Sequence, residues 1–168
     1  MANKTLIILF SYHHKNTEKL AEVIARVLGA EIKTPQQINP IEVQEYSLIG
    51  FGSGIYDGKH HQSLFDLVEK LPQVTGRKAF IFSTCGVPMI GMNDEYVAKN
   101  HAPLREKLQG KGYVIVDELS CVGHNTNSFL KHFGGINKGR PNAEDLKHAE
   151  ELAQKLKREM LLDSQDCC

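Results

Sequence analysis

The stretch LIILFSYHHKNTEKLAEVIARVL, residues 6–28, decides the fold. An apolar run ends at Phe10, the polar turn SYHHKNT follows, and an amphipathic run begins near Thr17. A continuous apolar run is typical of a strand that is buried on both faces. The run after the turn repeats apolar side chains at helical spacing, namely Leu20, Ile24, Val27 and Leu28. The stretch therefore predicts a strand, a turn and a helix, which is the repeating unit of a helix-covered parallel sheet.

The same unit recurs along the chain. Further strand-like runs are found at Ala30–Lys33 (the weakest), Ser47–Phe51, Lys78–Phe82 and Tyr113–Val116. Helical spacing follows several of them, with one helix expected to start near Ala102, because Pro103 suits a first helical turn. The last helix is expected after Asn142, a good N-cap, with Glu144 and Asp145 in its first turn.

These runs predict an α/β fold, a three-layer doubly wound five-stranded parallel sheet. Right-handed crossovers favour the strand order 2-1-3-4-5, whose ligand crevice lies at the carboxyl ends of the strands. We expect one domain over residues 1–162 and a short C-terminal tail over 163–168.

The turn SYHHKNT lies where a strand ends and a helix begins. Such a place offers unpaired N–H groups and the positive end of the helix dipole, so it is a ready anion site. Ser11, Asn16 and Thr17 supply short polar side chains, and three further residues, His13, His14 and Lys15, supply hydrogen bonds or charge. A phosphate dianion is the natural occupant. The alternative is an ordinary connection in which Asn16 or Thr17 serves only as the N-cap.

Two further strand ends are expected at the same edge of the sheet. The third strand leads into GFGSGIYDGKHHQS, in which glycines surround Tyr56, and the fourth leads into FSTCGVPMIGMND. Glycines allow close backbone approach, and Tyr56 offers an aromatic face for stacking. The end of the expected fifth strand, SCVGHNTNSF, is also polar and adds to the indication of a binding site at this edge.

These segments together resemble flavodoxin-like flavoproteins. SYHHKNTEKLA resembles their phosphate loop, commonly T-G-N-T before a helix, while GFGSGIYDG and FSTCG resemble their second and third flavin loops. GRPNAEDLKHAEELA is similar to the segment that opens the last helix in a subgroup of small flavodoxin-family proteins. The resemblance spans residues 4 to about 157, and its specificity comes from the order of the segments.

The resemblance implies FMN, with its phosphate on the first turn and its isoalloxazine between the second and third loops. The cofactor-binding residues implied are Ser11, His13, His14, Lys15, Asn16, Thr17, Ser53, Gly54, Ile55, Tyr56, Asp57, Gly58, Ser83, Thr84, Cys85 and Gly86. The chain departs from the family pattern at Lys15, where Gly is usual, and at His14, which replaces Thr. It contains no Trp, so the usual Trp/Tyr sandwich cannot form as such, and Tyr56 together with Tyr96 or a methionine has to substitute.

Composition restricts the function. Twenty Lys and Arg balance twenty Asp and Glu, which argues against a nucleic-acid binder that relies on positive charge. No apolar run is long enough to span a bilayer or to form a signal peptide, so a cytoplasmic location is expected. The histidine pairs lack metal-ligand spacing, so no metal is expected, and His60 and His61 are expected at the flavin pocket or in solvent.

The cysteines and the missing motifs argue against further classes of protein. Cys85, Cys121 and the terminal pair Cys167–Cys168 have no C-x-x-C spacing and are expected to be reduced. A serine hydrolase is disfavoured because G-x-S-x-G is absent. The nucleoside-triphosphate loop G-x-x-x-x-G-K-[ST] and the dinucleotide motif G-x-G-x-x-G are also absent.

Three functions remain open. The first is an electron carrier between redox partners, which the neutral charge weakens, because carriers of the resembled family are usually acidic. The second is an FMN-dependent reductase or oxidase acting on a small molecule such as a quinone or porphyrinogen. The third is a flavin-free binding domain on the same fold. The sequence assigns no catalytic residue.

Overall fold

The computed structural model describes residues 4–12, 14–126, 130, 132 and 134–165. The strands are β1 (Thr5–Phe10), β2 (Glu31–Lys33), β3 (Leu48–Tyr56), β4 (Lys59–His60), β5 (Arg77–Cys85) and β6 (Tyr113–Val122). The helices are α1 (Asn16–Leu28), α2 (Gln62–Lys70), α3 (Asp94–Gly110) and α4 (Ala143–Gln165), and short 3-10 helices lie at Pro35–Gln37, Glu42–Glu45 and Met89–Gly91. Strands and helices alternate as the sequence predicts, except that only 3-10 helices lie between β2 and β3 and that β4 follows β3 directly.

The sheet has the predicted topology. Within the described residues, the parallel strands lie in the order β2-β1-β3-β5-β6, which is 2-1-3-4-5 when the parallel strands are numbered along the chain. The prediction of a doubly wound α/β fold is therefore confirmed. One element was not predicted: β4 adds a two-residue antiparallel strand beside the end of β3.

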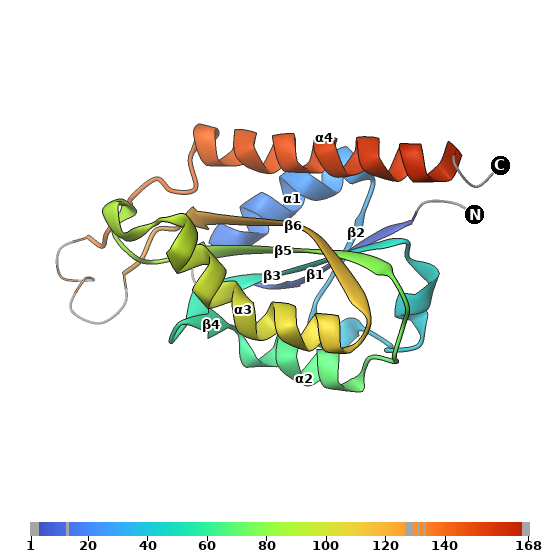
Figure 1. Cartoon of the computed structure of the whole chain (residues 1–168). Helices are drawn as coiled ribbons and strands as arrows, with labels where there is room; N and C mark the ends of the chain where they lie inside the picture. The colour runs from blue at the N-terminus through green and yellow to red at the C-terminus, as the bar shows by residue number, and fades with distance from the viewer. Residues whose placement is uncertain (1–3, 13, 127–129, 131, 133, 166–168) are drawn as a thin grey trace.

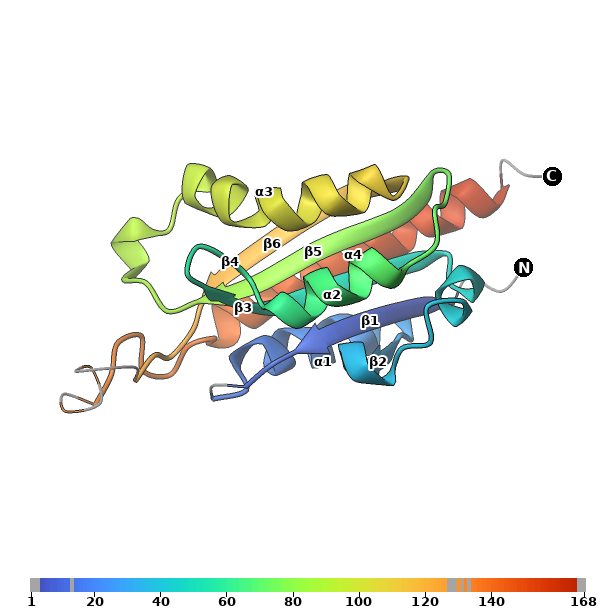
Figure 2. The ribbon, with the colours of Figure 1, turned by 90° about the horizontal axis from the view of Figure 1, so that it is seen from below.

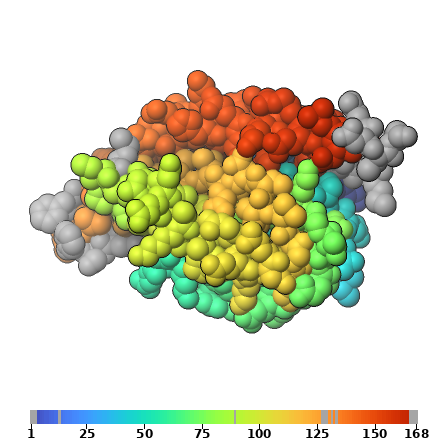
Figure 3. All heavy atoms as spheres, in the orientation of Figure 1, coloured from blue at the N-terminus to red at the C-terminus, as the bar shows by residue number. Residues whose placement is uncertain are grey.

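Helices cover both faces of the sheet. Figures 1 and 2 show α1 and α4 on one face and α2 and α3 on the other. In β1, Leu6 and Ile8 pack into the core on the α2–α3 side, and Ile7 and Leu9 pack into the core on the α1–α4 side. This burial of both faces explains why the strand reads as a continuous apolar run. Figure 3 shows part of the edge strand β6 at the surface between α3 and α4.

The central strands are longer than predicted. Strands β3 and β5 were expected to end at Phe51 and Phe82, but they continue to Tyr56 and Cys85. Glycine and serine do not stop these strands, because each of them is paired with a neighbouring strand on both sides. The Phe80 and Phe82 rings also fill the space over Gly50 and Gly52. A Cβ atom on these glycines would lie 2.3 and 2.1 Å from the ring Cζ atoms of Phe80 and Phe82. Segments 53–56 and 83–85 are therefore strand, not loop.

Helix α3 begins earlier than predicted. It starts at Asp94 and not near Ala102, and Pro103 lies inside it. The side chain of Asn93 caps the helix by accepting a hydrogen bond from the Tyr96 N–H at 2.8 Å. Proline inside a helix is unfavourable by about 3 kcal/mol, but His101 and Leu104 beside it are fully buried. Tertiary packing outweighs the local preference here.

The last helix begins as predicted. The Asn142 Oδ1 atom accepts hydrogen bonds from the Glu144 and Asp145 N–H groups, both at 3.1 Å, which confirms Asn142 as the N-cap of α4. The helix continues to Gln165, into the segment expected to be a tail, while the pair Cys167–Cys168 lies outside the described residues. Over the part of the chain that is described, no helix combines the length and apolar character needed to cross a bilayer.

Candidate functional site

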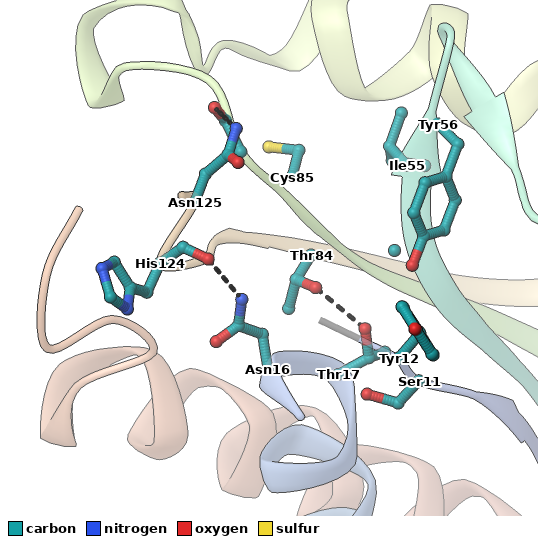
Figure 4. A pocket seen from close by; sticks show the side chains of 12 residues that line it. Ser11, Tyr12, Asn16, Thr17, Ile55, Tyr56, Thr84, Cys85, His124 and Asn125 are labelled. Atoms are coloured by element: carbon teal, nitrogen blue, oxygen red, sulfur yellow. Dashed lines mark hydrogen bonds between the residues drawn. The ribbon is translucent and has the colours of Figure 1, made fainter. Parts of the chain in front are cut away.

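A pocket opens at the carboxyl ends of β1, β3 and β5, the edge of the sheet where the sequence predicts a site (Figure 4). The turn before α1, the last residues of β3, the end of β5 and the segment after β6 all contribute to it. The lining residues are Ser11, Tyr12, Asn16, Thr17, Gly54, Ile55, Tyr56, Thr84, Cys85, Gly86, His124 and Asn125.

The turn before α1 has an unusual backbone. His14 and Lys15 both adopt positive φ angles, 50° and 52°, and Lys15 occupies the N-cap position without a side-chain cap hydrogen bond. In the first turn of α1, the Glu18 N–H has a long hydrogen bond of 3.4 Å to Ser11 Oγ. The helix N-terminus beside Ser11 therefore offers N–H groups and dipole charge to an anion.

Two buried side chains of α1 point into this region. Thr17 Oγ1 lies 2.8 Å from Thr84 Oγ1, which links α1 to β5 (Figure 4). Asn16 Nδ2 donates a hydrogen bond to the His124 carbonyl at 2.9 Å, but its Oδ1 atom is buried and has no partner among the described residues. A buried acceptor without a donor costs free energy of folding in the protein without a ligand. A hydroxyl or N–H group of a ligand would satisfy it.

Two basic residues of the turn, His14 and Lys15, do not line the pocket. His14 Nε2 lies 2.8 Å from Thr126 Oγ1, and the His14 ring stacks on His124 with centroids 4.4 Å apart. Lys15 Nζ pairs with Glu18 at 3.3 Å, and its side chain is largely exposed. Of the six residues nominated in this turn, Ser11, Asn16 and Thr17 line the pocket. His13 lies outside the described residues.

The predicted cofactor-binding residues in and after β3 differ in whether they reach the pocket. Gly54, Ile55 and Tyr56 line the pocket, and Ser53 is fully buried, with its Oγ 2.9 Å from His60 Nδ1. Asp57 and Gly58, with φ angles of 50° and 77°, form the tight turn into β4 and do not line the pocket. Partial burial raises the pKa of Tyr56, so its hydroxyl remains a neutral hydrogen-bond donor near pH 7.

An aromatic wall adjoins the pocket. His61 stacks flat on Phe10, with ring centroids 3.5 Å apart and an interplanar angle of 7°, and meets the Tyr56 ring edge-on at 5.5 Å. These three rings and Tyr12 line a mostly apolar hollow that shares Tyr12 and Tyr56 with the pocket. Partial burial lowers the pKa of His61, which favours its neutral form. We call Phe10, Tyr12, Tyr56 and His61 the aromatic wall.

The end of β5 contributes the third set of predicted cofactor-binding residues. Thr84, Cys85 and Gly86 line the pocket, and Ser83 is buried with its Oγ 2.8 Å from His101 Nε2. Burial raises the pKa of the Cys85 thiol, which keeps it neutral near pH 7. Cys85 Sγ lies 3.4 Å from Met92 Sδ. A neutral, buried thiol fits the packing role better than that of a nucleophile.

The sequence did not predict that Tyr12 or the residues after β6 would line the pocket. Asn125 Nδ2 donates to the Gly86 carbonyl at 3.0 Å, and the main chain of His124 holds Asn16. The polar fifth strand end, SCVGHNTNSF, was the signal for these contacts, although it did not indicate which residues would make them. Within the described ranges, no three His, Cys, Asp or Glu side chains converge to hold a metal ion.

The comparisons with known proteins agree with this geometry. The sequence profile of the flavodoxin domain matches residues 7–122. The chain belongs to the flavodoxin domain family. An uncharacterized protein of Methanocaldococcus jannaschii is 46% identical over 153 residues, which cover 91% of this chain and 97% of that one. The flavodoxin profile thus includes the turn before α1 and the ends of β3 and β5, and it stops before His124.

Solved flavodoxins have the same fold. Oxidised flavodoxin 2 from Bacillus cereus superposes with a TM-score of 0.69 and 17% identity, covering 93% of this chain and 99% of that one. A flavodoxin from the domain Archaea gives a TM-score of 0.67 and 17% identity, covering 93% and 97% of the two chains. At this level of identity the likeness shows the fold alone, and the chemistry depends on the residues of the pocket.

Proposed function

We propose that this flavodoxin-family protein binds FMN in the pocket and carries electrons between redox partners. One observation carries the proposal: the N-terminus of α1, short polar side chains and the Tyr56 ring all border one pocket. A helix N-terminus suits a phosphate group, and an aromatic face suits a flat ring. The family resemblance of the three strand ends adds support.

The pocket residues fit this cofactor in kind. The N–H groups at the start of α1, with Ser11 and Thr17, would hold the phosphate, and the unpartnered Asn16 Oδ1 would accept a hydrogen bond from a ribityl hydroxyl. Tyr56 would lie against the ring, and the backbone of residues 83–86 would face its polar edge. The bound flavin supplies one- or two-electron transfer, while the protein controls its position and access.

The aromatic wall favours a second candidate function. Tyr12 is 76% exposed, and the apolar hollow that it lines adjoins the cofactor pocket. A flat apolar acceptor such as a quinone would fit against these rings, which would make the protein an FMN-dependent reductase. The two candidates share the cofactor and differ in the acceptor.

Binding of FMN by the apoprotein tests the proposal. We expect FMN fluorescence to be quenched on binding, and riboflavin, which lacks the phosphate, to bind at least tenfold more weakly. Absence of FMN binding would overturn the proposal and favour the flavin-free domain. Rapid, repeated turnover of a quinone with NAD(P)H would favour the reductase, whereas reduction and reoxidation only by protein partners would favour the carrier.

A further inference from the structure

The hollow over the aromatic wall has the size of a small-molecule site. Its volume is about 470 Å³, and the described residues that line it are Phe10, Tyr12, Tyr56 and His61. Sites for small ligands usually have volumes of about 300–1,000 Å³. Tyr12 and Tyr56 also line the pocket proposed for FMN, so the two sites adjoin each other. A set of ring faces that is open to solvent suits a flat, apolar ligand.

His61 is held in a fixed orientation at this hollow. Its backbone N–H donates a hydrogen bond to Ser53 Oγ at 3.0 Å, and its ring stacks on Phe10. Its Nδ1 atom accepts a hydrogen bond from the Ser63 N–H at 3.2 Å, which makes His61 the N-cap of α2. Its neighbour His60 is buried in the core, 1% exposed, so the prediction that both histidines lie at the pocket or in solvent is wrong for His60.

The cap of α2 also decides which ring nitrogen of His61 carries a hydrogen. A backbone N–H only donates, so Nδ1 has to offer its lone pair, and in the neutral ring the hydrogen lies on Nε2. Partial burial lowers the pKa of His61, which favours this neutral form. Nε2 makes no hydrogen bond to any residue that the structure describes. Its N–H group is therefore a donor that remains available to water or to a ligand.

The lining of the hollow restricts the kind of ligand. Among the described residues it contains no Asp, Glu, Lys or Arg, and His61 is neutral near pH 7, so a charged ligand would form no ion pair there. The rings favour an aromatic ligand, and the N–H of His61 favours an oxygen that accepts a hydrogen bond. A hydrocarbon ring would remove water from this N–H without replacing the hydrogen bond, which costs free energy of binding.

We propose that the hollow binds an uncharged aromatic ring with a carbonyl oxygen, as in a quinone, and that the Nε2–H group of His61 donates a hydrogen bond to that oxygen. The inference deepens the second candidate function and rests on it for the role of the site, which is to hold the electron acceptor beside FMN. His61 determines specificity, because it distinguishes a ring with an acceptor oxygen from a hydrocarbon ring. Phe10 positions His61 by covering one face of its ring.

Binding of duroquinone to the full chain loaded with oxidised FMN provides the first test. Every ring carbon of this quinone is substituted, so it does not add to thiols such as Cys85. Without a reductant the quinone stays oxidised, and binding is measured apart from turnover. The titration is followed by NMR, and we expect shifts of the side-chain signals of the aromatic wall. Long-range ¹H–¹⁵N spectra should show the hydrogen of His61 on Nε2.

His61→Asn tests the role of the histidine. Asparagine is a good N-cap, so the variant should keep the thermal stability of the wild type while it loses the ring and its Nε2–H group. We expect duroquinone to bind at least about fivefold more weakly, which is the usual effect of losing one hydrogen bond. His148→Asn, at an exposed position on α4, is the matched control and should bind duroquinone as the wild type does.

A matched pair of ligands separates the hydrogen bond from ring packing. Acetophenone and ethylbenzene have similar shapes, but only acetophenone has a carbonyl oxygen. In His61→Asn the affinity for acetophenone, relative to the affinity for ethylbenzene, should fall by about fivefold. An unchanged ratio of the two affinities would show that His61 contributes packing alone, and it would overturn the proposed hydrogen bond.

The outcomes also distinguish this inference from the proposed function. A chain that binds FMN but shows no shifts of the aromatic wall with duroquinone would overturn the inference and leave the cofactor proposal intact. A chain that binds duroquinone at the aromatic wall but does not bind FMN would retain the site and overturn the cofactor proposal. Contact of a protein partner with Tyr12, in the absence of duroquinone binding, would make the hollow a protein interface and would overturn the inference.

Discussion

The hydrogen bond between the Thr17 and Thr84 hydroxyls shows how the pocket is built from single residues. The two hydroxyls are 2.8 Å apart, and the residues are only 2% and 5% exposed. Replacing one partner leaves the other buried without a hydrogen bond, and replacing both removes the need for one. The polar lining of the pocket is therefore also a contact that holds α1 to β5.

This arrangement predicts a non-additive double-mutant cycle. Thr17→Val and Thr84→Val should each lower the free energy of unfolding of the apoprotein by about 1–3 kcal/mol, because one buried hydroxyl loses its partner. The double variant should lose clearly less than the sum of the two. Urea unfolding provides the measurement, and Thr75→Val at an exposed position is the control. Additive losses would show that the two hydroxyls do not depend on each other.

At the scale of elements, the turn before α1 combines two opposing effects of Lys15. Its left-handed conformation, with φ 52° and ψ 32°, is unfavourable for a residue with a side chain, by about 1–2 kcal/mol. Its charge lies at the N-terminus of a helix and next to the place where we propose a phosphate. The family pattern, in which glycine is usual here, relieves the strain and gives up the charge.

We expect Lys15→Gly to separate the two effects. The thermal stability of the apoprotein should rise by the equivalent of about 0.5–1 kcal/mol, since relief of strain exceeds the entropy that glycine adds to the unfolded chain. The affinity for FMN should fall, and its dependence on salt should weaken. Lys19→Gly, inside α1, is the control and should destabilise by about 1 kcal/mol. A variant that is less stable than wild type would contradict the strain argument.

The elements also show which parts of the fold a sequence can predict. The strand–turn–helix unit at residues 6–28 was predictable, because apolar runs and helical spacing are local signals. The start of α3 was not, because burial of His101 and Leu104 overrides the signal from Pro103. The extension of β3 through its glycines depended on the large rings of β5, which lie far away in sequence.

The site was predictable to the extent that one strand end contains its own signal. Ser11, Asn16, Thr17, Tyr56 and Thr84 follow directly from polar or aromatic residues at strand ends. Whether a neighbouring residue such as Ser53 lies at the pocket or in the core depends on the strand continuing past Phe51, which the apolar run alone did not predict. The contacts of Asn125 depend on how a segment after β6 folds back, which no local pattern encodes.

For the whole molecule, positive and negative charges balance, so the pH dependence of stability depends on individual groups rather than on net charge. Among the described groups, Glu118 is the one most clearly expected to make stability depend on pH, because its carboxylate joins α3 to β6 through His101 and Arg105. Its pKa in the folded protein is about 2, against an ordinary value of 4.5. Folding therefore favours the ionised form.

The sign of the effect follows from this difference. Glu118 stabilises the fold fully above its ordinary pKa of 4.5, and the contribution is lost as the pH falls toward about 2. Glu118→Gln should be less stable than wild type at neutral pH, and the urea midpoints of the two proteins should converge between about pH 5 and 2. Glu22→Gln, an exposed change on α1, should follow the wild-type curve. Parallel curves for wild type and Glu118→Gln would show that the link between α3 and β6 does not depend on this charge.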